Sequence, residues 1–121
     1  MKRADVISVH LRLSPETEGL IGEKEFDLMK PTAIIINTAR GAIIDHQALV
    51  EALREKKIAG AGIDVYPVEP ISADDPLLKL DNVVLPPHSA GMTRGAMDAG
   101  LNMAVDNIIQ FTQGKPVRVV S

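Results

Sequence analysis

The 121-residue sequence contains no cysteine and no tryptophan, and aromatic residues make up only 2% of it. The lack of cysteine excludes a disulfide framework and a zinc site with thiolate ligands, and we predict no metal site. Because aromatic residues are scarce, the core must consist of aliphatic side chains. No apolar run is long enough to cross a bilayer and no signal-peptide pattern opens the sequence, so we expect a cytoplasmic protein without a membrane partner.

A surplus of positive charge is also absent. Thirteen Lys and Arg residues stand against sixteen Asp and Glu residues, which gives a net charge of −3. No basic cluster stands out, so we expect no nucleic-acid partner. Hydrophobic residues make up 45% and charged residues 24% of the sequence, which is typical of a globular protein, and the length suits one domain.

The sequence does contain a regular alternation of strand and helix patterns. The apolar run over residues 33–36, mostly β-branched, is typical of a parallel strand buried on both faces. Comparable patterns predict strands over residues 6–11, 33–37, 60–65 and 82–85. Helices are predicted over residues 23–30, 45–57 and 93–113, with one turn over 76–79. This order favours an α/β fold with four parallel strands side by side in chain order.

Two of the predicted helices carry recognisable caps and apolar faces. Asp45 and Thr93 are N-cap candidates for the second and third helices. The third helix has an apolar track at helical spacing, which we expect to face a core. The residues on this track are Leu101, Ala104, Val105, Ile108, Ile109 and Thr112.

Polar residues lie at or just after the carboxyl ends of all four predicted strands. They are His10, Asn37 to Arg40, Asp64 with Glu69, and His88. In a parallel sheet these ends lie along one edge, where ligands bind. A carboxylate stabilises a nearby imidazolium, and such a histidine suits the role of proton donor and acceptor. Arg40 can bind a carboxylate through two hydrogen bonds, and the glycine that follows it permits close backbone approach. Taken alone, Arg40 as a solvated loop residue and His10 as a structural histidine remain open alternatives.

Four motifs in this order resemble the NAD-dependent D-2-hydroxyacid dehydrogenases, a D-isomer-specific and phosphoglycerate dehydrogenase-like family. They are VHLRLSPET at residues 9–17, NTARG at 37–41, Asp64-Val65 with Glu69-Pro70, and PHSAG at 87–91. The resemblance covers nearly the whole chain. It implies a three-layer Rossmann-like parallel sheet with flanking helices, which is half of a doubly wound dinucleotide-binding domain.

The resemblance also implies a role for each matching residue. Arg40 would bind the carboxylate of a small 2-hydroxy or 2-keto acid, His88 would be the general acid/base, and Glu69 would pair with His88. Many relatives have proline where this sequence has Arg12, and the acid at Glu69 argues against the formate dehydrogenase branch. The residues that would contact NAD or NADP are Leu11, Arg12, Thr17, Thr38, Ala39, Arg40, Asp64, His88, Ala90 and Gly91.

The family's glycine-rich turn, G-x-G-x-x-G, is absent from the sequence, and so is a substrate domain. We therefore interpret residues 1–121 as the second half of a Rossmann-type NAD-binding domain that lacks both parts. Two functions remain open: an oxidoreductase fragment, inactive alone, or a non-catalytic half-domain that serves folding, assembly or protein interaction. Because such a half leaves an unpaired edge strand and a bare sheet face, we expect a homodimer that pairs edges, packs faces or exchanges the last helix.

Overall fold

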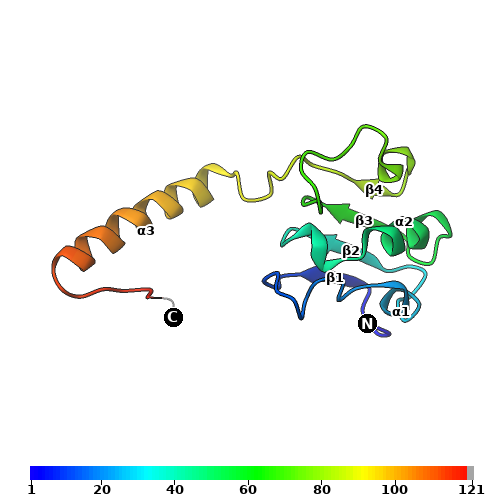
Figure 1. Cartoon of the computed structure of the whole chain (residues 1–121), viewed down its shortest axis with the longest axis horizontal. Coiled ribbons are helices and arrows are strands. Elements are labelled where there is room, and N and C mark those ends of the chain that lie inside the picture. Colours follow the sequence, from blue (N-terminus) through cyan, green and yellow to red (C-terminus); the bar gives the residue numbers. More distant parts are fainter. Residues whose placement is uncertain (120–121) are drawn as a thin grey trace. The chain divides into compact units, whose positions relative to one another are not determined.

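The computed structural model describes residues 1–119, and Figure 1 shows its helices and strands. The chain forms two compact units, Met1–His88 and Ser89–Ser121. The first unit contains one parallel sheet whose strands lie side by side in chain order: β1 (Val6–Val9), β2 (Ile34–Asn37), β3 (Gly60–Ile63) and β4 (Val83–Val84). The predicted α/β fold with four parallel strands is confirmed.

The strands are shorter than the sequence pattern indicated. β1 ends at Val9 instead of residue 11, and Val9 lies opposite Asn37, the last residue of β2. The side-chain Nδ2 of Asn37 donates to the carbonyl oxygen of Arg40 at 2.9 Å and so stabilises the turn that follows β2. Pairing therefore stops where the polar turn begins, although the apolar pattern of the first strand continues.

The helical segments of the first unit connect these strands. They are α1 (Glu23–Phe26), the 3₁₀ turn η1 (Gly41–Ile43), α2 (His46–Arg54) and the 3₁₀ turn η2 (Pro76–Lys79). Asp45 caps α2 as predicted, because its Oδ1 accepts from the backbone N–H of Ala48 at 2.8 Å. α1 and α2 both end before the predicted residues. α2 ends early because Lys56 adopts a left-handed conformation with φ 55°.

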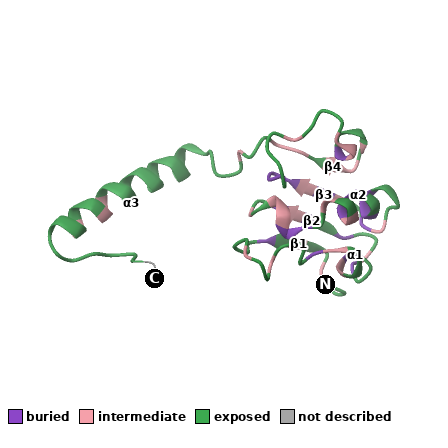
Figure 2. Cartoon of the chain, in the orientation of Figure 1, coloured by how far each residue is buried: buried purple, intermediate pink, exposed green. Residues whose placement is uncertain are grey.

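The core lies between one face of the sheet and the two helices. Ile35 and Ile63 on this face are buried together with Phe26 of α1 and Leu49 and Leu53 of α2. Figure 2 shows that the buried residues of the first unit belong to the strands, α2 and their neighbouring segments. The unit Met1–His88 thus supplies two of the three layers that we expected, a sheet and one layer of helices.

The opposite face of the sheet is apolar and open within this unit. Because side chains alternate along a strand, Val6, Ile34 and Val84 point away from the helices. Their exposed fractions are 60%, 40% and 70%. β1 also forms one edge of the sheet, so its outer backbone groups have no strand partner within Met1–His88.

The second unit contains α3 (Arg94–Thr112), whose position agrees with the prediction. Thr93 caps it, because its Oγ1 accepts from the backbone N–H of Ala96 at 3.2 Å. The predicted core track is wrong for this unit, since none of the residues of α3 is buried. A single helix offers its apolar side chains no partner inside its own unit. No helix in residues 1–119 combines the length and hydrophobicity that a membrane span requires.

Candidate active site

The predicted catalytic residues line one cavity beyond the carboxyl ends of the strands. The cavity has a volume of about 290 Å³, and Arg40, Glu69 and His88 all contribute to its wall. Arg40 follows β2, Glu69 lies on the loop after β3, and His88 follows β4. The topology of a parallel sheet therefore brings together three side chains that are distant in the sequence.

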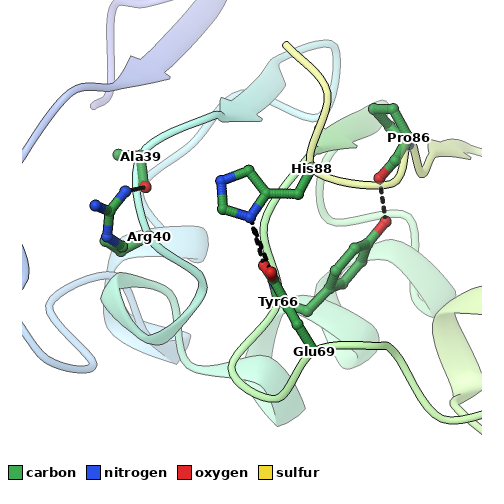
Figure 3. A network of polar contacts seen from close by, with 6 residues as sticks. All are labelled: Ala39, Arg40, Tyr66, Glu69, Pro86 and His88. Atoms are coloured by element: carbon green, nitrogen blue, oxygen red, sulfur yellow. Dashed lines mark hydrogen bonds and ion pairs between the residues drawn. The ribbon is translucent and has the colours of Figure 1, made fainter. Parts of the chain in front are cut away.

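His88 and Glu69 form a close pair in this cavity (Figure 3). The Nδ1 atom of His88 lies 2.8 Å from Oε2 and 3.1 Å from Oε1 of Glu69. Because an ionised carboxylate can only accept, Nδ1 carries the proton of this hydrogen bond. The hydrogen bond from His88 and a second one from the backbone N–H of Tyr66 lower the pKa of Glu69 below its ordinary value of 4.5. The structure thus holds a carboxylate against one side of the imidazole and directs Nε2 to the other side.

Arg40 lies on a turn that Asn37 shapes. The buried side chain of Asn37 accepts from the backbone N–H of Ala39 at 3.0 Å and donates to the carbonyl of Arg40 at 2.9 Å. Arg40 itself is exposed, and its Nη1 donates to the carbonyl of Ala39 at 2.7 Å. No carboxylate in residues 1–119 forms an ion pair with Arg40. Its charge is therefore available to an anionic ligand.

Gly41 brings the Arg40 turn against the loop that carries Glu69. A Cβ atom at Gly41 would lie 2.1 Å from the carbonyl carbon of Tyr66 and 2.4 Å from the nitrogen of Pro67. The close backbone approach that we predicted at this glycine thus involves the chain's own Tyr66–Pro67 peptide. Only a residue without a side chain fits this contact.

A second cavity, of about 460 Å³, contains half of the predicted cofactor contacts. Its lining residues from that set are Leu11, Arg12, Thr38, Ala39 and Arg40. Thr17 instead stabilises the neighbouring loop, because its hydroxyl donates to the carbonyl of Arg12 at 2.7 Å. Asp64 is buried at the end of β3, and Ala90 and Gly91 belong to the second unit. In residues 1–119, no group of three or more His, Asp or Glu side chains is arranged to hold a metal ion.

Sequence reasoning did not predict the contacts of two residues that hold parts of the wall of the 290 Å³ cavity. Asn37 was recognised only as one of the polar residues at the strand ends. In turns, however, an asparagine side chain often accepts a hydrogen bond from the backbone N–H two residues later. Tyr66 was not recognised at all. Its hydroxyl donates to the carbonyl of Pro86 at 2.8 Å, and no local pattern encodes that contact.

Comparison with known proteins places these features in a family. Residues 1–90 match the family model described as D-isomer specific 2-hydroxyacid dehydrogenase, NAD binding domain. Over 115 residues, which are 95% of this chain and 34% of the relative, the chain is 50% identical to a glyoxylate reductase of Aeropyrum pernix. It is also 50% identical over 116 residues to a D-3-phosphoglycerate dehydrogenase of Archaeoglobus fulgidus. This match covers 95% of the chain and 22% of that relative.

Solved structures agree with this result. An acyclic imino acid reductase in complex with NADPH and D-Arg is similar with a TM-score of 0.91 and 40% identity, over 100% of this chain and 38% of that one. The NAD-complexed D-isomer specific 2-hydroxyacid dehydrogenase of Lactobacillus delbrueckii ssp. bulgaricus is similar with a TM-score of 0.84 and 34% identity. This match covers 97% of this chain and 39% of that one. The chain spans only about a third of the length of the glyoxylate reductase that it matches, 34%.

Proposed function

The chain belongs to the D-isomer specific 2-hydroxyacid dehydrogenase family, and from that membership we propose that it supplies the catalytic residues of an NAD(P)-dependent reductase. The reaction would convert a 2-keto acid into a D-2-hydroxy acid and back. One observation carries the proposal. Arg40, Glu69 and His88 line a single cavity, and Nδ1 of His88 lies 2.8 Å from Oε2 of Glu69.

Each of the three residues has a separate task in this proposal. Arg40 binds the substrate carboxylate, since its guanidinium offers a planar pair of donors and has no ion-pair partner in residues 1–119. His88 donates a proton from Nε2 to the substrate's carbonyl oxygen during reduction and takes it back during oxidation. Glu69 holds Nδ1 and stabilises the imidazolium form between turnovers.

We propose the second cavity as part of the cofactor site. Bound NAD(P)H would supply the hydride that joins the carbonyl carbon. The cavity's volume of about 460 Å³ lies in the usual range for small-molecule sites, and it shares Arg40 and Leu13 with the catalytic cavity. We propose that the cofactor contacts Leu11, Arg12, Thr38, Ala39 and Arg40 there. The roles of Thr17, Asp64, His88, Ala90 and Gly91 toward the cofactor also remain proposals.

We further propose that residues 1–121 are the second half of the NAD-binding domain and do not turn over substrate alone. The sequence has no glycine-rich turn for the cofactor's pyrophosphate. Loss of the orientation that such a turn gives can forfeit roughly 7–11 kcal/mol of barrier reduction. The bare sheet face and the 34% coverage of the glyoxylate reductase support this interpretation.

A chimeric enzyme tests the proposed function. In it, this chain replaces the matching segment of the Aeropyrum pernix glyoxylate reductase, with which it shares 50% identity. We expect the chimera to reduce glyoxylate, followed through nicotinamide absorbance, and the chain alone to show no turnover. Turnover by the chain alone would contradict the need for the missing parts. A folded chimera that binds NADH but stays inactive would contradict the catalytic role and favour a non-catalytic half-domain.

Self-association of the chain is a separate proposal. We propose that the chain alone forms a homodimer, because within Met1–His88 the residues Val6, Ile34 and Val84 form an apolar sheet face without a covering helix, beside the free edge of β1. Light scattering on a size-exclusion column at micromolar concentration should give twice the mass of one chain. Ile34→Asp should produce a folded monomer, whereas Val68→Asp, at an exposed loop position, should leave the dimer intact. A stable wild-type monomer would contradict this proposal.

A further inference from the structure

Tyr66 connects the three segments that carry the candidate catalytic residues. Its backbone N–H donates to Oε1 of Glu69 at 3.0 Å, and its hydroxyl donates to the carbonyl of Pro86 at 2.8 Å. Figure 3 shows the contact between the hydroxyl of Tyr66 and Pro86 next to the His88–Glu69 pair. The peptide that follows Tyr66 packs directly on Gly41, beside Arg40.

The contact with Pro86 matters because of the backbone that follows it. Pro86 and Pro87 have restricted backbone angles, so an anchored Pro86 carbonyl constrains the direction in which the chain reaches His88. His88 has a left-handed backbone conformation with φ 53°, which is uncommon outside glycine and persists only where the surroundings hold it. The hydroxyl of Tyr66 and the carboxylate of Glu69 are two groups that hold this segment.

The environment of Tyr66 keeps its hydroxyl a donor. The residue is buried, with an exposed fraction of 9%. Burial raises the pKa of the phenol above its ordinary value of 10.0, and the charges of Asp64, Glu69 and Asp75 raise it further. The hydroxyl therefore keeps its proton throughout the neutral range and can donate to the Pro86 carbonyl.

From this arrangement we propose that Tyr66 is a positioning residue, which sets the approach of His88 to Glu69 and to Arg40 by binding Pro86. The inference rests on the proposed function for its catalytic consequence. Its alternative is that Tyr66 donates a proton to the substrate itself. The bond to Pro86 argues against that role, because the single hydroxyl proton already has an acceptor at 2.8 Å.

Tyr66→Phe removes the hydroxyl and leaves the ring and the backbone N–H in place. In the chimera we expect kcat to fall about fivefold to tenfold, the effect of one lost hydrogen bond, with KM for glyoxylate changed less than about twofold. The acidic limb of the kcat profile should move to higher pH, since a weaker hydrogen bond from His88 raises the pKa of Glu69. Phe26→Leu, a core substitution in α1, is the control for a general loss of stability and should leave kcat and the profile unchanged.

The same variant is tested without catalysis in the 121-residue chain. Carbon NMR of labelled Glu69 should show its pKa moving up toward 4.5 in Tyr66→Phe, because the hydrogen bond from His88 is the main cause of its low value. Tyr66 is the only tyrosine, so 3-fluorotyrosine labels this position alone and lowers the pKa of the phenol without a substitution. Titration of the labelled phenol should then move the Pro86 carbonyl and His88 ring signals with the same midpoint.

Each outcome decides between the possibilities. An inactive wild-type chimera contradicts the proposed function. The NMR results still test the hydrogen bond between Tyr66 and Pro86, because they do not depend on activity. An active chimera in which Tyr66→Phe keeps the wild-type kcat and pH profile overturns the positioning role. A loss of about 10³-fold or more, together with the disappearance of one limb of the profile, overturns it in favour of direct proton donation. Should the variant not fold, unchanged Pro86 and His88 signals on titration of the fluorinated phenol overturn the proposal.

Discussion

His88→Gln should lower kcat of the chimeric enzyme by about 10²–10⁴-fold, the usual contribution of a general acid/base. Glutamine matches the imidazole in size and polarity but cannot pass a proton to the substrate. The geometry that supports this expectation is the contact of 2.8 Å between Nδ1 of His88 and Oε2 of Glu69. Steady-state kinetics with glyoxylate and NADH measure the effect, and KM should change far less than kcat.

Two control variants make this result specific. His46→Gln removes a histidine that lines neither the cofactor cavity nor the catalytic cavity and whose Nε2 lies 3.0 Å from Oδ2 of Asp75, and we expect kcat to stay within about threefold. Arg40→Ala should mainly raise KM for the keto acid, since it removes carboxylate binding. A His88→Gln enzyme that keeps kcat within tenfold of the wild type would contradict the acid/base role.

Gly41→Ala should destabilise the first unit by about 1–3 kcal/mol or more, the usual range for overpacking. The new Cβ would lie 2.1 Å from the backbone of Tyr66, and backbone cannot rotate aside as a flexible side chain can. The loop that carries Glu69 must then move away from the turn that carries Arg40. In the chimera we therefore expect activity to fall together with stability.

Urea unfolding measures the free-energy change. Far-UV circular dichroism reports on the whole chain, and fluorescence reports on Tyr66 alone, because the chain has one tyrosine and no tryptophan. Gly22→Ala is the matched control in the same unit, since its Cβ would meet the nearest atom only at 3.7 Å. A Gly41→Ala chain with wild-type stability and an unchanged tyrosine spectrum would show that the loop does not pack on this glycine in solution.

The sequence by itself determined the order and type of the elements. The apolar run over residues 33–36 indicates a buried strand wherever it lies, because its hydrophobicity does not depend on any partner. Asp45 and Thr93 mark helix starts, because each bonds to a backbone amide only three residues away. The convergence of Arg40, Glu69 and His88 also followed from the sequence, since parallel strands in chain order bring their carboxyl ends to one edge.

Only the tertiary structure decided what holds that edge together. Tyr66 and Pro86 are 20 residues apart, and neither has a local pattern that points to the other. The space at Gly41 is closed by the Tyr66–Pro67 peptide, whose position depends on the whole loop after β3. The apolar track of α3 predicted a core contact, yet periodicity describes only the helix and does not specify its partner. Local interactions are encoded by spacing along the chain, whereas contacts between distant segments depend on how the loops pack.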